Sequence, residues 1–276
     1  MTSAIRSRSL AALAGALALT AATAASAATC RDPAGFDKWL DDIRREAVAQ
    51  GISRRAVEAG LNGVKFDQAV YRKDRGQGAF RVPFEQFVAK RVTAARVRAA
   101  ANQLRQRAAL FSQIEQRFGV PGPVIAAIWA METDFGAVMG TMPVVQSVAT
   151  LAYDCRRTER FTGELFAALR VIDKGQLSPS EMRGAWAGEI GQTQFMISNY
   201  DKYAVDFDGN GRPDLIRSVP DVLASTANYL RGHGWQRGAG WNPGQPNFAV
   251  IKEWNKSDNY ARAIALFASK LAGEAD

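Results

Sequence analysis

Histidine and cysteine are scarce in this chain of 276 residues, which has one histidine, His233, and two cysteines, Cys30 and Cys155. Zinc centres need several such ligands close together, so a zinc enzyme is poorly supported. A serine-histidine-aspartate hydrolase is disfavoured too, because no nucleophile-elbow motif accompanies His233. We expect this histidine to be a loop or capping residue.

The mature chain also lacks an apolar run of the ~20 residues that a membrane-spanning helix requires. A short apolar run that begins at Leu10 follows a basic start and leads to small residues that end at Ala27. This order is typical of a secretory signal peptide. We therefore expect residues 1–27 to be removed and residues 28–276 to reach the periplasm as a soluble protein. A lipid anchor on Cys30 is not expected, because the preceding residues fit a lipobox poorly.

Glycine-rich or proline-rich linkers, heptads and repeats are absent as well, so residues 28–276 are expected to form a single domain. In an oxidising compartment Cys30 and Cys155 are a candidate disulfide, which would stabilise the fold by roughly 2 to 4 kcal/mol. Two free buried thiols are the alternative.

The charge of the chain is clearly positive, with a formal net charge of +8 at pH 7. A basic exported protein is attracted to polyanions. Export favours the acidic surfaces of a bacterial envelope over nucleic acid as the partner. A solvated basic surface without any partner is the alternative.

Apolar residues recur with helical spacing along most of the chain, whereas alternating, β-branched runs are scarce, so the sequence predicts a mainly α protein with little or no β. The predicted helices cover residues 36–48, a short segment from Ser53, one long helix over 93–118, and residues 123–135, 143–153, 158–173, 220–231 and 257–271. Polar, glycine-containing loops are predicted over residues 184–200, 206–218 and 232–247.

The most informative segment is GVPGPVIAAIWAMETDFG, residues 119–136, which is bounded by prolines and a glycine as helices often are. Glu132 falls four residues after Ile128 and is predicted to share its core-facing side of the helix. Burial disfavours a charged carboxylate, so the pKa of Glu132 should be raised, which suits a general acid. The alternative is a glutamate satisfied by an arginine or a helix N-terminus. Asp134 projects to the other side and is expected to be a solvated or capping residue.

The ETDFG motif after an aliphatic helix resembles the lytic murein transglycosylase B family. Four further blocks fit this family in the same order: GAWAGEIGQTQFMISNY, YAVDFDGNGRPDL, SVPDVLASTANYLRGHGW and NFAVIKEWNKSDNYA. The resemblance implies a lysozyme-like helical domain with irregular cleft loops, and we expect a monomer without an organic cofactor. It also implies cleavage of the β-1,4 bond from N-acetylmuramic acid (MurNAc) to N-acetylglucosamine (GlcNAc) in peptidoglycan glycan strands, with formation of 1,6-anhydro-MurNAc. Glu132 would serve as the general acid and then as the base.

Candidate substrate-binding residues lie in these blocks. Gln194 and Phe195 are carried over from the family motif, and the other candidates offer uncharged hydrogen-bonding groups or flat aromatic faces suited to sugars. Core packing is the alternative for each aromatic residue. The expected set is Gln192, Gln194, Phe195, Ser198, Tyr200, Tyr229, Trp254 and Asn255.

Glu189 stands where a small residue is common in this family, and it supports a different mechanism. If Glu189 lay across the cleft from Glu132, the two carboxyl groups would suit a hydrolytic muramidase. A further alternative is a protein that binds peptidoglycan without cleaving it.

A cation site is predicted by the spacing Asp206-x-Asp208-x-Asn210-Gly211, which matches the first half of an EF-hand loop. Position twelve is Arg217 in place of glutamate, so closure would come from Asp214 or Asp221. A calcium ion with a structural role is expected, and a loop rich in Asx turns is the alternative. The candidate ligands are Asp206, Asp208, Asn210, Arg212, Asp214 and Asp221.

Overall fold

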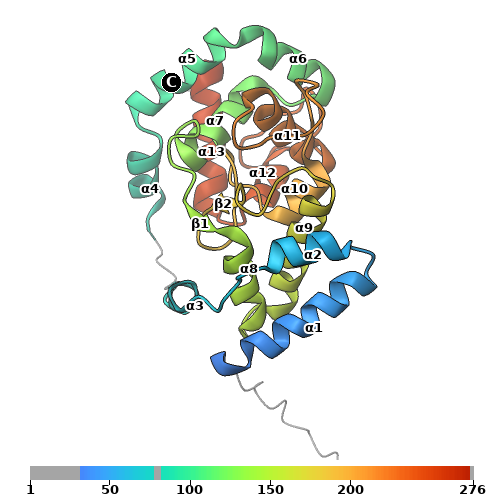
Figure 1. Cartoon of the computed structure of the whole chain (residues 1–276). Helices are drawn as coiled ribbons and strands as arrows, with labels where there is room; N and C mark the ends of the chain where they lie inside the picture. Colours follow the sequence, from blue (N-terminus) through green and yellow to red (C-terminus); the bar gives the residue numbers. More distant parts are fainter. Residues whose placement is uncertain (1–31, 78–81, 274–276) are drawn as a thin grey trace, which may run out of the picture.

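Helices make up most of the chain that the computed structural model describes, residues 32–77 and 82–273 (Figure 1). After a 3-10 turn at Pro33–Gly35, the helices are α1 (Phe36–Ala49), α2 (Arg54–Leu61), α3 (Gln68–Arg75), α4 (Phe84–Arg91), α5 (Ala94–Gln106), α6 (Ala108–Phe118), α7 (Gly122–Thr133), α8 (Val144–Tyr153), α9 (Thr158–Asp173), α10 (Ile197–Tyr203), α11 (Val219–Gly232), α12 (Phe248–Trp254) and α13 (Asp258–Ala272). Within these described residues, strand is confined to β1 (Met142–Pro143) and β2 (Arg183–Gly184), which pair antiparallel. The prediction of a mainly α fold is confirmed.

The predicted long helix over residues 93–118 is wrong, because the chain breaks at Arg107, where φ is −120° and ψ is 29°. Before the break α5 packs on α7 and α13, and after it α6 packs chiefly on α11. The guanidinium of Arg107 lies 5.8 Å from the ring centroid of Trp129. The two helices thus pack against different neighbours, and the amphipathic pattern of the sequence does not reveal the break between them.

Four short helices, α3, α4, α10 and α12, were not predicted. Each has only seven or eight residues, so its periodic signal is weak and its stability comes largely from packing. Local capping still contributes, because the carboxylate of Asp67 accepts hydrogen bonds from the amides of Ala69 and Val70 in the first turn of α3.

Some predictions concern residues near the start of the chain. The expected signal peptide, residues 1–27, and Cys30 lie outside the described residues. Cys155 is disulfide-bonded, and none of the described cysteines is free. Its pairing with Cys30 stays a prediction. No helix within the described ranges is long and apolar enough to cross a membrane.

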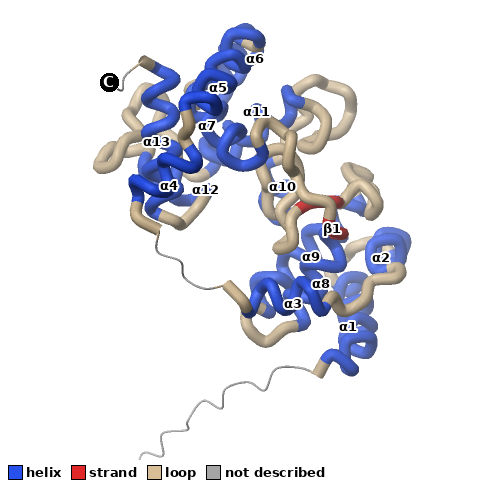
Figure 2. The backbone as a smooth tube through the Cα atoms, turned by 90° about the vertical axis from the view of Figure 1, so that its left-hand side faces the viewer, coloured by secondary structure: helices blue, strands red, loops and turns tan. Residues whose placement is uncertain are grey.

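The helices form two groups, which Figure 2 shows one above the other. In the first group, here called the α9 group, α9 packs against α2 and α8, and these contact α1 and α3. In the second, the α7 group, α7 packs against α5, α6, α11 and α13, while α4 and α12 contact α13. Helix α10 contacts both α9 and α11 and so connects the two groups.

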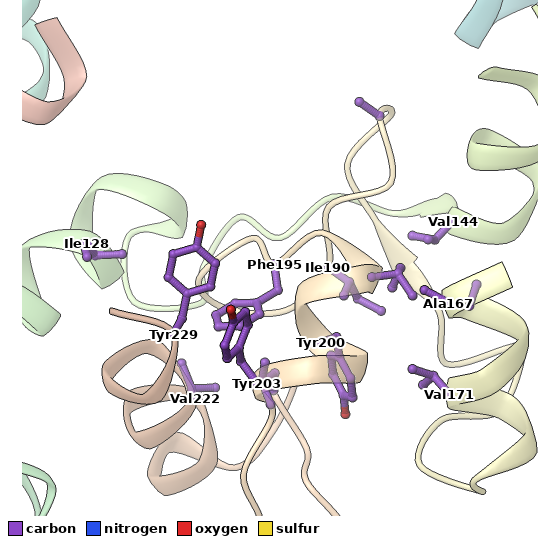
Figure 3. Close-up of a cluster of buried hydrophobic side chains, with 14 of the residues drawn as sticks. Ile128, Val144, Ala167, Val171, Ile190, Phe195, Tyr200, Tyr203, Val222 and Tyr229 are labelled. Atoms are coloured by element: carbon purple, nitrogen blue, oxygen red, sulfur yellow. The ribbon is translucent and has the colours of Figure 1, made fainter. Parts of the chain in front are cut away.

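The core continues from one group into the other through the segment that precedes and includes α10 (Figure 3). Ile190, Phe195 and Tyr200 from this segment are buried between residues of α9 and α11. Burying aliphatic or aromatic side chains of this size contributes roughly 1.5 to 3 kcal/mol each. The connecting segment is therefore held in place by the core on both sides, which fixes the loops that line the site.

Candidate active site

A cavity of about 630 Å³ lies at the junction of the two helix groups. Its walls come from the end of α7, the first turns of α9, the loop and helix of residues 185–199, and the residues around the end of α12. The lining residues are Glu132, Arg160, Ala185, Trp186, Glu189, Gln194, Phe195, Met196, Asn199, Tyr229, Glu253, Trp254, Asn255 and Lys256.

Six residues predicted to act at the site are brought together in this cavity: Glu132, Gln194, Phe195, Tyr229, Trp254 and Asn255. The three remaining candidates do not line it and have structural partners instead. Tyr200 is fully buried and donates a hydrogen bond to the carbonyl of Pro213 (2.7 Å). Both the amide and the hydroxyl of Ser198 donate to the carboxylate of Glu164 (2.8 and 2.7 Å).

Gln192, the third of these candidates, joins α7 to the loop before α11. Its Oε1 accepts a hydrogen bond from the indole of Trp129 (2.9 Å), and its Nε2 donates to the carbonyl of Ile216 (3.0 Å). The side chain is buried, and both ends of its amide are satisfied. Gln192, Ser198 and Tyr200 thus have hydrogen-bond partners that shape the site, and their contact with substrate stays a prediction.

Glu132 is in the last turn of α7, and two donors hold one of its carboxylate oxygens. Oε1 accepts a hydrogen bond from the indole Nε1 of Trp254 (2.9 Å) and another from the hydroxyl of Tyr260 (2.5 Å). Among the described residues no hydrogen bond reaches Oε2. One oxygen of the carboxyl group is therefore fixed by the protein, and the other is available to a ligand in the cavity.

Burial raises the pKa of Glu132, and the charge of Glu189 adds to this effect. The hydrogen bonds from Tyr260 and Trp254 act in the opposite direction, because they stabilise the carboxylate. The predicted upward shift is confirmed. Tyr260 is buried, and both burial and the neighbouring Glu132 raise its own pKa well above the ordinary value, so its hydroxyl stays a donor near neutral pH.

The predicted core-facing side of the helix, shared with Ile128, explains the position of Glu132 only in part. Helix α7 is buried on every side, and Val124, Ala126 and Trp129 are as inaccessible as Ile128. The apolar spacing therefore does not single out one face. Glu132 differs because its side chain is only partly buried and opens onto the cavity.

The residues after Glu132 end the helix sharply. Asp134 caps α7 in the left-handed conformation (φ 50°), and its carboxylate pairs with the guanidinium of Arg96 at 2.6 and 2.8 Å. The hydroxyl of Thr133 donates to the carbonyl of Gln192 and accepts from the amide of Gly136 (2.8 Å). The expected capping role of Asp134 is confirmed, and the motif fixes the end of α7 against the neighbouring loop.

Three aromatic residues form the wall beside Glu132. The Trp254 ring meets those of Phe195 and Tyr229 edge to face, with centroids 5.3 and 5.0 Å apart. Phe195 and Tyr229 lie next to each other in Figure 3 and are only 2% and 5% exposed, so Trp254 presents more of its surface to the cavity. His233 caps α11 and stacks on Tyr229, which confirms its expected capping role.

Glu189 also lines the cavity, on a turn that leaves little freedom. The amide of Ala185 donates to the carbonyl of Glu189 (2.8 Å), and a Cβ on Gly184 would lie only 1.9 Å from that carbonyl oxygen. Oε2 of Glu189 is buried without a hydrogen-bond partner among the described residues. Burial raises the pKa of this carboxyl group, which favours the neutral acid.

A cluster of three carboxylates lies in the loop before α11. Asp206, Asp208 and Asp221 each place an oxygen within 4.8 Å of the others. Asp221 is buried, and burial together with the nearby charge of Asp208 raises its pKa. Crowded carboxylates of this kind are relieved by an oxygen-binding cation.

The other candidate ligands are used differently. The carboxylate of Asp214 accepts from the amides of Ile216 and Arg217 (both 2.9 Å), so closure of the cluster comes from Asp221. The guanidinium of Arg212 donates to the carbonyl of Gln176 (3.1 Å). The side chain of Asn210 accepts from the amide of Arg212 (3.3 Å).

The family model described as a transglycosylase SLT domain matches residues 35–245 of the chain. The chain belongs to this family. Trp254 and Tyr260 come after the matched residues in the chain, yet both donate hydrogen bonds to Glu132, which lies inside the matched range.

A curated relative is membrane-bound lytic murein transglycosylase B of Escherichia coli (strain K12), which is 41% identical over 140 residues. That match spans 48% of this chain and only 38% of the relative. Solved structures of similar fold include SltB3 from Pseudomonas aeruginosa in complex with NAG-NAM-pentapeptide (TM-score 0.81, 32% identity, 86% of this chain and 80% of that chain). Another is Slt35 from E. coli in complex with calcium (TM-score 0.73, 27% identity, 84% of this chain and 92% of that chain).

The site contains residues that the sequence did not single out. Tyr260 is the clearest, since it donates to Glu132, and it lies within the block of residues 247–261 that carried the resemblance. Trp186 and Asn199 lie in the block of residues 184–200 and also line the cavity. Arg160 belongs to no motif, so only the packing of α9 against the site reveals it.

Proposed function

We propose that the protein is a lytic transglycosylase that cleaves the MurNAc-β-1,4-GlcNAc bond of peptidoglycan and forms 1,6-anhydro-MurNAc. The observation that carries this proposal is the geometry of Glu132, a partly buried acid with a raised pKa and two donors on a single oxygen. A carboxyl group of this kind is protonated when it meets substrate and is stabilised once it has given up its proton.

The reaction uses Glu132 twice. Glu132 first donates its proton to the glycosidic oxygen, and the bond from that oxygen to C1 of MurNAc breaks. The carbonyl oxygen of the substrate's N-acetyl group holds the developing charge at C1, as in substrate-assisted glycosidases. The Glu132 carboxylate then takes the proton of the C6 hydroxyl, O6 bonds to C1, and the acid is regenerated without consumption of water.

Trp254 and Tyr260 favour the charged state of Glu132 between these two steps, because both donate to Oε1. The surface of Trp254 also faces the cavity and suits a sugar ring. Gln194 is held by the carbonyls of Met139 (3.1 Å) and Gly191 (3.0 Å), and its place in the lining suits contact with an acetamido or hydroxyl group.

The proposal is tested with Glu132→Gln, which keeps the shape and hydrogen-bonding oxygen of the side chain but has no acidic proton. The variant should bind cell walls as the wild type does and fail to reduce their turbidity. Equal clearing by both proteins would contradict a catalytic role for Glu132. If neither protein clears walls and both bind them, the non-catalytic alternative is favoured.

A second candidate function is hydrolysis by a muramidase, and the presence of Glu189 in the same cavity favours it. We place this function second, because two donors support the charged form of Glu132 through both proton transfers, whereas Oε2 of Glu189 is buried without a hydrogen-bond partner in the described part of the chain. Reducing-end products without the anhydro ring, lost on Glu189→Gln, would establish hydrolysis.

We further propose calcium as a structural ion bound by Asp206, Asp208 and Asp221. Their oxygen donors and crowding fit this cation, and the related Slt35 structure is in complex with calcium. The proposal also includes export of a soluble, monomeric, single-domain protein to the periplasm. The basic charge of the chain suits an acidic envelope.

A further inference from the structure

The cavity has two walls of different chemistry. Glu132 and Trp254 belong to one wall, whereas Arg160, Trp186 and Glu189 belong to the other, which is built from the start of α9 and the turn before α10. Sugar rings are bound by flat apolar faces and uncharged hydrogen-bonding groups. The neutral part of a glycan strand therefore does not explain why the second wall carries a cation.

Arg160 is an available cation. Its neighbours Arg156 and Arg157 are both paired with the buried carboxylate of Asp74. The other cation that lines the cavity, Lys256, is paired with Glu253 at 2.5 Å. Arg160 is exposed and has no ion pair among the described residues.

Glu189 shares this wall with Arg160, whose charge lowers the Glu189 pKa against the larger effect of burial. No ion pair joins them among the described residues, and the turn that carries Glu189 is fixed by the hydrogen bond from Ala185. The side chain of Arg160 instead lies over the ring of Phe161, with its guanidinium carbon 5.6 Å from the centroid. This wall therefore presents a positive charge to whatever occupies the cavity.

We propose that Arg160 is a specificity-determining residue that binds a carboxylate carried by the MurNAc unit of the substrate. This inference rests on the proposed function, because it takes a peptidoglycan strand as the ligand. The planar guanidinium matches a carboxylate with two parallel hydrogen bonds. Such a carboxylate has two chemical sources: the peptide stem attached to MurNAc, and the lactyl group left free when the stem is removed.

The test measures binding in the Glu132→Gln background, so that ligands stay intact. Dissociation constants are determined by calorimetry for three tetrasaccharides. The first is two linked GlcNAc-MurNAc units with their peptide stems, the second is the same glycan with its stems removed, and the third is chitotetraose, which has no carboxylate. At least one carboxylate ligand should bind about fivefold to tenfold more tightly than chitotetraose. Adding Arg160→Gln should abolish this preference, and Arg160→Lys should retain part of it.

Arg98→Gln is the matched control, because Arg98 is an exposed arginine on α5 outside the cavity lining. It should leave all three constants unchanged. The preference should also weaken as salt is raised, since the Arg160 side chain is exposed. A preference for the stem-bearing ligand alone supports the stem as the source, and a preference for the stem-free glycan alone supports the lactyl group. A preference for both ligands shows that Arg160 accepts either carboxylate.

Two results would overturn a role for Arg160 in specificity. In the first, Arg160→Gln weakens the binding of all three ligands equally, which would indicate a structural role. In the second, Arg160→Gln leaves the preference for the carboxylate ligands unchanged. Both failures are distinct from failure of the proposed function. The latter is read from the wild-type enzyme, by its clearing of cell walls and the chemical form of its products.

Discussion

Removal of the Tyr260 hydroxyl by Tyr260→Phe tests how the neighbouring side chains set the pKa of Glu132. The hydroxyl donates to Oε1 of Glu132 at 2.5 Å, and this hydrogen bond lowers the pKa of Glu132 against the larger effect of burial. Its removal should raise that pKa further. Because Glu132 must carry its proton to start the reaction, the alkaline limb of kcat/KM should move to higher pH.

The same hydrogen bond strengthens when Glu132 becomes charged. Hydrogen bonds to charged groups contribute about 1.5 to 3 kcal/mol. If this contribution is realised in the transition state, kcat should fall roughly 10-fold to 150-fold. The expected phenotype is therefore a slower enzyme that stays active at higher pH than the wild type.

The assay is a pH–rate profile of muropeptide release from purified cell walls. Tyr71→Phe is the control, because Tyr71 lies beside Phe66 in the α9 group, away from the cavity. It should change neither kcat nor the profile. An alkaline limb for Tyr260→Phe that stays in place or moves to lower pH would refute the reasoning, even if the rate falls.

Three further predictions concern stability. The folded protein binds the Glu132 proton more tightly than the unfolded chain, so stability falls as pH rises from the unfolded pKa of about 4.3 toward the raised folded pKa. Glu132→Gln should therefore raise the Tm at pH 7, and the difference should vanish below about pH 4; a lower Tm at pH 7 would contradict this. A calcium chelator should lower the Tm of the wild type and leave that of Asp221→Ala unchanged, whereas equal responses would argue against the ion. Gln192→Ala should reduce stability by about 1 to 3 kcal/mol, because the buried indole of Trp129 loses its acceptor. Denaturant unfolding measures this loss, and a much larger effect on KM than on stability would restore Gln192 as a binding residue.

The sequence identifies the acid because Glu132 is an ionisable residue in an otherwise apolar helix. It does not identify Tyr260, which is 128 positions away and reaches Glu132 only through the packing of α13 on α7. Long-range contacts of this kind have no local pattern.

The same limit applies to the predicted substrate-binding residues, of which only some line the cavity. Gln192 and Gln194 are two residues apart in one motif, yet Gln192 is buried against Trp129 while Gln194 lines the cavity. Tyr200 and Trp254 are both aromatic residues in motif blocks, and only burial in the core separates their roles. Residue type predicts that a group can bind a sugar, whereas the fold decides whether it faces one.

In the proposed reaction Glu132 closes the 1,6-anhydro ring without water. Mass analysis of the muropeptides released by the wild-type protein tests this claim most directly, because an anhydro end is lighter by one water than a reducing end. We expect anhydro-MurNAc ends from the wild type and none from Glu132→Gln. Release of hydrated reducing ends by the wild type would contradict it.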